Sequence, residues 1–181
     1  MPVTLAQLLR EWHDFYVLVG TASATLVGLM FVAASIGSSF FNEESRASMK
    51  TFITPTVVHF AAVLFTSLMG IIPTHSWRTL GVLLSIMGLA GSIYCGRLLV
   101  WLAIRHRFNV DWEDRMFYAF IPLLGYLLLL ISAVLLFIRS AVSPNLIAVA
   151  ILTLLLASLR NAWDMTLWIV IRAPTGTERQ P

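Results

Sequence analysis

The sequence predicts an all-α membrane protein, a bundle of five transmembrane helices preceded by a short interfacial helix. Its 181 residues are 59% hydrophobic and only 12% charged, whereas an average soluble domain carries about 25% charged residues. A soluble fold could not cover this much apolar surface, so a membrane protein is expected. Five apolar runs, each near the ~20 residues that cross a bilayer, set the number of spans.

The spans form one predicted domain, residues 1–172, followed by a polar tail, residues 173–181, that is expected to be disordered. The predicted spans cover residues 15–40, 51–72, 79–104, 117–138 and 146–171. Before the first span, Thr4 and Gln7 form a capping box ahead of leucines at helical spacing. This pattern predicts a short helix lying on the bilayer surface. The fourth span is mostly leucine and is expected to be the helix most exposed to lipid.

Basic residues in the loops predict the orientation, because they gather on the cytoplasmic side of a membrane. Seven of them lie on one side of the predicted bundle and three on the other. The C-terminus lies on the seven-charge side, so it is expected in the cytoplasm and the N-terminus outside. The net charge of +3 is too small and scattered for nucleic-acid binding. The single cysteine, Cys95, excludes an intrachain disulfide framework.

Two spans carry small residues at helical spacing. Small residues let helix backbones approach closely, which is how helices associate where water is absent. The sequence therefore predicts two helix-packing faces, within the monomer or between subunits. The first span contributes Gly20, Ala24 and Gly28, and the third contributes Gly81, Ser85, Gly88 and Ser92.

A second pattern concerns polar residues inside the spans. His59, Arg97 and the pair Arg160 and Asp164 lie on three different spans, each about 10–16 Å from the same predicted end at 1.5 Å per residue. Asn161 shares a helix face with Arg160 and Asp164. A charge in the bilayer interior costs about 2.5–3.5 kcal/mol even on lenient scales, so these groups are expected to meet. We therefore expect the second, third and fifth spans to surround one buried polar cluster.

Two interpretations of this cluster remain open. In the first, Arg160 and Asp164 form a structural clamp, and Arg97 extends toward the interface as arginines do near helix ends. In the second, the cluster binds an ion, a lipid phosphate or an anionic ligand, because one aspartate cannot neutralise two arginines.

Catalytic and cofactor signatures are missing from the sequence. It has no H-E-x-x-H, G-x-S-x-G or P-loop motif, so a non-enzymatic role is favoured and the question of an activity stays open. Bis-histidine haem would need two interior histidines, and only His59 is clearly interior, so no cofactor is expected. The acidic segment 111–114 is explained by helix capping, so no metal site is expected.

The segments FYVLVG (15–20) and ATLVGLMFVA (24–33), together with RNAWD (160–164), resemble small polytopic bacterial membrane proteins of unassigned function. The resemblance covers the first and last spans. It implies a bacterial inner membrane and carries over no functional residues.

These observations lead to three functional hypotheses. The first is a non-enzymatic integral membrane protein that works by helix–helix assembly, as a homo-oligomer or as a small subunit of a larger membrane complex. The second is a small channel or carrier for an anion or protons that uses the buried Arg/Asp/His cluster. The third is a lipid- or cofactor-binding subunit of a membrane enzyme.

Overall fold

The computed structural model describes residues 5–38, 43–72, 76–104 and 116–172, and these residues are helical apart from short turns. The predicted tail and the acidic segment 111–114 lie outside the described residues. The helices are α1 (Leu5–Glu11), α2 (His13–Ser38), α3 (Glu43–Ile71), α4 (Trp77–Ile104), the π-helix η1 (Met116–Phe120), α6 (Ile121–Phe137) and α7 (Ser143–Arg172).

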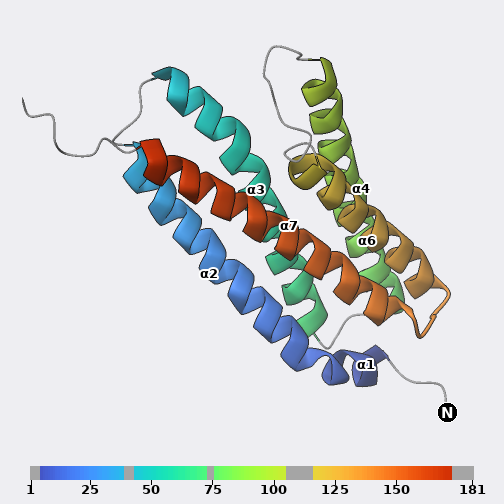
Figure 1. Ribbon diagram of the computed structural model, residues 1–181. Coiled ribbons are helices and arrows are strands. Elements are labelled where there is room, and N and C mark those ends of the chain that lie inside the picture. Colours follow the sequence, from blue (N-terminus) through green and yellow to red (C-terminus); the bar gives the residue numbers. More distant parts are fainter. Residues whose placement is uncertain (1–4, 39–42, 73–75, 105–115, 173–181) are drawn as a thin grey trace, which may run out of the picture.

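The predicted fold class is confirmed. Within the described residues, five helical segments are long and apolar enough to cross a membrane, with η1 and α6 together forming one of them. The short α1 lies across one end of the bundle (Figure 1), and its Leu5 and Leu9 are buried in the main core. The chain is therefore a multi-pass membrane protein with a short N-terminal helix.

The five spans pack in an order that differs from their order in the sequence. Helix α7 lies between α3 and α6, α2 packs on α3, and α4 packs on α6 (Figure 1). The consecutive helices α3 and α4 contact each other only slightly. We expected the second, third and fifth spans to surround one cluster. Instead, α3 and α7 pack together, and α4 is attached chiefly to α6.

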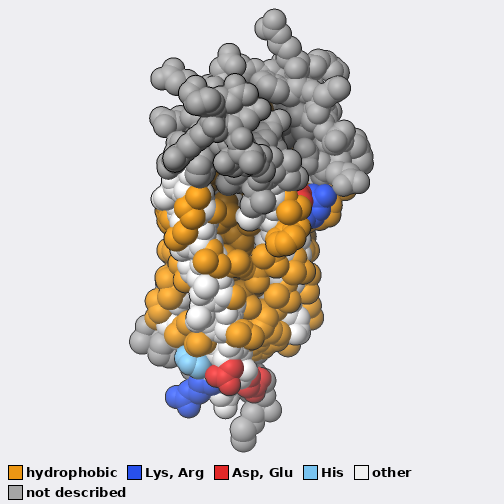
Figure 2. Space-filling view, turned by 60° about the vertical axis from the view of Figure 1, so that its left-hand side comes forward, with side chains coloured by type: hydrophobic (Ala, Val, Ile, Leu, Met, Phe, Trp, Pro, Cys, Tyr) orange, Lys and Arg blue, Asp and Glu red, His pale blue; other side chains and the backbone are white. Residues whose placement is uncertain are grey.

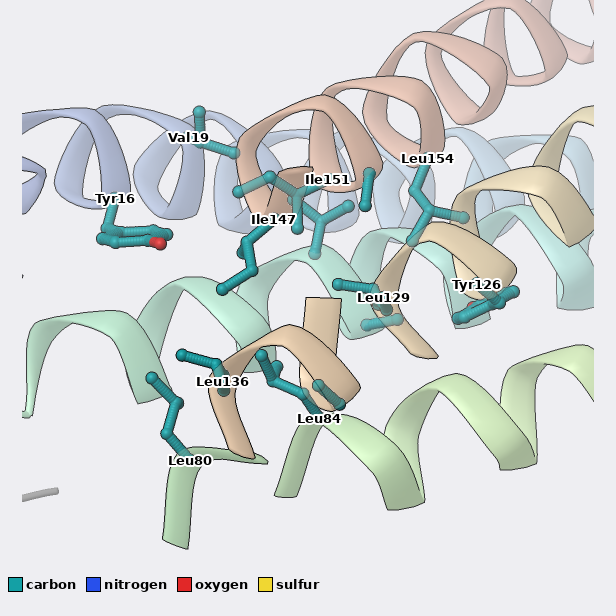
Figure 3. Packing of buried hydrophobic residues seen from close by; sticks show 14 of the residues in the cluster. Tyr16, Val19, Leu80, Leu84, Tyr126, Leu129, Leu136, Ile147, Ile151 and Leu154 are labelled. Carbon is teal, nitrogen blue, oxygen red and sulfur yellow. The ribbon is translucent and has the colours of Figure 1, made fainter. Parts of the chain in front are cut away.

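Leucine and isoleucine side chains fill the interfaces between these helices (Figure 3). On one side of α6, Leu80 and Leu84 of α4 join Leu129 and Leu136 in a continuous core. On the other side, α7 contributes three residues to the same core, Ile147, Ile151 and Leu154. Burial on both sides explains why α6 is more buried than α2 or α4. The expectation that the leucine-rich fourth span is the most lipid-exposed helix is therefore wrong.

Two glycine positions let the neighbours of α6 approach it closely. A Cβ atom added at Gly91 of α4 would lie 2.2 Å from the ring of Tyr126, and one added at Gly125 of α6 would lie 2.8 Å from Leu154 of α7. Real side chains do not approach so closely, so glycine is required at both positions unless the neighbours move. Tyr126 thus occupies the space that the missing Gly91 side chain leaves.

The turn between α6 and α7 has a defined geometry. Arg139 adopts a left-handed conformation with φ 54°. Its N–H donates to the carbonyl of Leu136 at 3.0 Å, and the N–H of Ser140 donates to the carbonyl of Leu135 at 2.9 Å. This pair of bonds is a Schellman motif, in which glycine usually occupies the left-handed position. Such a short connection makes α6 and α7 antiparallel neighbours.

The surface of the bundle is apolar around its middle. Figure 2 shows, on the face turned toward the viewer, a hydrophobic band with the visible charged side chains near its ends. Every spanning helix contributes large exposed hydrophobic side chains, among them Leu18, Val58, Ile86, Ile131 and Leu156. A soluble protein rarely exposes so continuous an apolar surface, so this band matches a lipid environment.

Candidate functional site

The five residues of the predicted polar cluster have different environments. His59 and Asn161 are completely buried. Arg160 and Asp164 are partly exposed, with 31% and 35% of their side-chain surface accessible. Arg97 is exposed on α4. The structure thus joins Arg160 to Asp164, places His59 and Asn161 in the interior, and leaves Arg97 on the surface of α4.

The interior polar groups gather around η1, the π-helical turn that opens the fourth span. Pro122 follows this turn and has no N–H. In a π-helix, the N–H of residue 122 would bond to the carbonyl of Phe117, and in an α-helix to that of Tyr118. The proline therefore removes a hydrogen bond from this turn. Inside a bilayer a freed carbonyl must find another donor, because no water is available.

Asn161 of α7 supplies that donor. Its Nδ2 donates to the carbonyl oxygen of Phe117 at 3.1 Å. In return, the hydroxyl of Tyr118 donates to the carbonyl oxygen of Asn161 at 3.4 Å. The two bonds link η1 to α7 in both directions. They explain why an amide lies in the middle of an apolar helix, because its side chain and its carbonyl both bond to η1.

His59 of α3 pairs with Tyr126 of α6, whose hydroxyl lies 2.9 Å from Nδ1. The ring of Tyr94 on α4 stands nearly perpendicular to the imidazole, with the two centroids 6.1 Å apart. The backbone of Tyr118 lies beside the imidazole as well. A phenol that donates to Nδ1 leaves the proton of a neutral imidazole on Nε2. His59 is therefore the residue at which α3, α4 and α6 come together.

Arg160 contacts Asp164 and Phe117. Its Nη1 lies 3.1 Å from Oδ2 of Asp164, one helical turn farther along α7. Its guanidinium carbon lies 3.9 Å from the centre of the Phe117 ring, a cation–π contact. The aromatic face and the carboxylate together reduce the cost of placing this cation near lipid. The pair thus also attaches α7 to η1.

A few buried polar atoms have no hydrogen bond of good geometry among the described residues. They include His59 Nε2, Ser67 Oγ, Ser92 Oγ and Asn161 Oδ1. Such atoms in an apolar interior are the usual positions of internal water. They lie on α3, α4 and α7, so the polar interior of the bundle extends beyond the predicted residues.

The two small-residue faces have opposite surroundings. On α4, Gly81 lies against Phe137 and Gly88 against Leu130, and the hydroxyl of Ser85 donates to the carbonyl of Gly81 at 2.8 Å. On α2, a Cβ added at Gly20 would lie 3.1 Å from Ser67 of α3.

Farther along α2, the small residues turn away from the bundle. Ala24 is exposed, and among the described residues no atom beyond the local backbone of α2 lies within 4 Å of a Cβ added at Gly28. The face of α4 is therefore covered within the chain, whereas most of the face of α2 is open.

The sequence reasoning did not select Tyr118, Tyr126 or Pro122 as site residues. A signal for the site was present, because a proline well inside an apolar run implies a freed carbonyl four or five residues earlier. An amide or imidazole on another span is then the expected donor.

Within the described residues, no three histidine, cysteine, aspartate or glutamate side chains are grouped so that they could hold a metal ion. No protein-family model, curated protein or solved structure matches the chain.

Proposed function

We propose that this protein works by assembly in the membrane, as a homo-oligomer whose subunits meet along the outward face of α2. Membership of a larger membrane complex through the same face is the alternative. A bacterial inner membrane with the C-terminus in the cytoplasm remains our proposed location, from the loop charges and the sequence resemblance.

The observation that carries the proposal is the open space beside Gly28. A glycine inside a transmembrane helix lowers helix propensity by about 1 kcal/mol relative to alanine. Within a packed seam, close approach of another backbone compensates for this loss. A Cβ added at Gly28 has no described atom within 4 Å apart from the local backbone of α2. A helix of another subunit could pack closely against α2 at Gly28.

The polar groups next to this gap also suit a helix partner. The hydroxyl of Thr25 donates to the carbonyl of Thr21 at 2.9 Å, and that of Ser35 donates to the carbonyl of Phe31 at 2.8 Å. Because these hydroxyls are satisfied within α2, the face needs no polar partner and can lie against lipid or another helix. Figure 2 shows polar side chains and backbone running through the apolar band on the face turned toward the viewer.

The channel hypothesis receives less support from the geometry. It requires Arg97, Arg160, Asp164 and His59 to line one constriction. Arg97 is exposed on α4, whereas His59 is completely buried between α3 and α6. These groups do not share one surface, which favours assembly over conduction.

Cysteine cross-linking in native membranes tests the proposal. Ala24→Cys and Gly28→Cys place thiols on the open face of α2, and Ile86→Cys places a matched thiol on the outward face of α4, where Ile86 is 61% exposed. The native Cys95 is fully buried and does not interfere. With a membrane-permeant oxidant, we expect covalent dimers from the α2 variants and little from Ile86→Cys. Absence of dimers at both α2 positions would remove the homo-oligomer proposal.

A further inference from the structure

The outward face of α4 carries a cation in otherwise apolar surroundings. Arg97 is exposed, while Ile93 and Val100, which flank it along the helix, are 54% and 58% exposed. Within the described part of the chain, no carboxylate or carbonyl is hydrogen-bonded to or ion-paired with Arg97. Charged residues in spans usually face the protein interior. An arginine that faces lipid, with no partner among the described residues, is suited to an anion that the lipid supplies.

The position of Arg97 along the helix indicates where that anion comes from. Helix α4 has 28 residues and is therefore about 42 Å long, against about 30 Å of hydrocarbon. A centred helix projects about 6 Å beyond the hydrocarbon at each end. Arg97 precedes the end at Ile104 by seven residues, or about 10 Å, so its Cα lies about 4 Å inside the hydrocarbon boundary.

At this depth the long arginine side chain is within reach of the layer of lipid phosphates. Its Cα–Cβ bond tilts toward the helix N-terminus and hence toward the bilayer centre, which limits how far the side chain extends into water. A phosphate that moves slightly inward completes the pair. The exposed isoleucine and valine on either side offer an apolar surface to the acyl chains of the same lipid.

We propose that Arg97 is a binding site for the phosphate of an anionic phospholipid in the leaflet at the α4 C-terminus. The site prefers an anionic lipid to a zwitterionic one, because a choline or ethanolamine group already neutralises the phosphate in the latter. Guanidinium binds phosphate through two parallel hydrogen bonds, which lysine cannot reproduce. This inference is independent of assembly through α2.

Native mass spectrometry tests the site. Wild-type protein is reconstituted in phosphatidylcholine vesicles containing phosphatidylglycerol, then extracted, and its retained lipids are identified. We expect wild-type protein to retain phosphatidylglycerol selectively and Arg97→Leu to bind it about tenfold more weakly, as for loss of one charge-assisted hydrogen-bonded pair. Arg97→Lys is expected to fall between the two.

The matched control is Arg78→Leu, which removes an exposed arginine from the first turn of the same helix. It should leave phosphatidylglycerol retention unchanged, and excess inorganic phosphate should not displace the lipid. Equal retention by Arg97→Leu would overturn the site, as would equal loss in Arg78→Leu. Displacement by inorganic phosphate would indicate a soluble anion instead. Loss of a co-purifying polypeptide from Arg97→Leu, with lipid retained, would indicate a protein carboxylate.

Two further measurements keep the result interpretable. Thermal unfolding in detergent should be unchanged in Arg97→Leu, because the exposed side chain has no hydrogen bond or ion pair with a described residue. Arg97→Gln removes the charge and keeps a polar side chain, so it provides a second neutral variant. It should lose phosphatidylglycerol to the same extent as Arg97→Leu, and retention by Arg97→Gln would contradict a site that depends on charge.

Discussion

The small-residue faces of α4 and α2 look alike in the sequence and have opposite roles in the structure. Gly81 and Gly88 of α4 lie against side chains of α6, whereas Gly28 of α2 has open space beside it. The difference follows from spacing. Residues 81, 85, 88, 92 and 95 alternate steps of four and three, and this repeat drifts by only about 20° per heptad.

The face of α2 uses steps of four alone. Each step rotates by about 40° beyond a full turn, so Gly20, Ala24 and Gly28 wind around the helix. Gly20 therefore contacts α3, and Gly28 has turned outward. Small residues indicate where two helices can approach closely. Their spacing determines over how many turns the same neighbouring helix can contact them.

A similar contrast separates two polar residues. Asn161 is buried and donates to a carbonyl of its own chain. Arg97 is exposed on the outward surface of α4 and has no hydrogen-bond or ion-pair partner among the described residues. Mutations of buried residues are thus expected to change folding, and mutations of these outward residues are expected to change binding.

The largest expected effect comes from a Cβ atom added at a packed glycine, Gly91 of α4, compared with one added at an open glycine, Gly28 of α2. Gly91→Ala places a Cβ 2.2 Å from the ring of Tyr126, and overpacking of this kind destabilises by about 1–3 kcal/mol. Gly28→Ala meets no atom and should leave the monomer unchanged or stabilise it by up to about 1 kcal/mol through helix propensity. Unfolding of monomers in mixed micelles measures both changes. Equal stability of the two variants would contradict the assigned packing.

A smaller effect is expected from removing the Asn161 side-chain amide, which donates to the carbonyl of Phe117 in η1. Asn161→Ala should destabilise by about 0.6–2 kcal/mol, the range for hydrogen bonds between transmembrane helices. Pro122→Ala restores the missing N–H, so in that background the same mutation should be less harmful by about 0.5–1 kcal/mol. A double-mutant cycle measured by unfolding gives this coupling. Strictly additive effects would show that the Asn161 side chain does not compensate for the N–H that Pro122 lacks.

The smallest expected effect concerns the turn that joins α6 to α7. Arg139→Gly places glycine at φ 54° and should stabilise the fold by about 1 kcal/mol, because a left-handed conformation costs other residues about 1–2 kcal/mol. Thermal unfolding measures this gain. The adjacent Ser140→Gly lacks the left-handed geometry and serves as the control, which should not be stabilised.

Apolar run length was enough to predict the five helices, and their ends lie close to the expected positions except for α3. That helix begins at Glu43 rather than at about residue 51, because hydropathy marks where a span enters lipid and not where a helix begins. The order of packing was not predictable in the same way. Leucine on every side of a helix is compatible with lipid or with a neighbour, which is why the burial of α6 was missed.

The candidate site was partly predictable. The pairing of Arg160 with Asp164 follows from i, i+4 spacing and is present. The joining of Asn161 to Phe117 depends on which helices are neighbours, and a single sequence does not supply that information. Arg97 lies at a depth similar to that of the other ionisable groups, but depth alone cannot distinguish the lipid-facing side of a helix from its packed side.

The central claim is that the open face of α2 joins subunits, and the mass of the assembly in lipid nanodiscs tests it most directly. Gly28→Leu fills the gap on α2, and Gly96→Leu fills a position on α4 that also has no atom within 4 Å. The account predicts an oligomer for the wild type and for Gly96→Leu, and a monomer for Gly28→Leu. An oligomer that persists unchanged in Gly28→Leu would contradict assembly through this face.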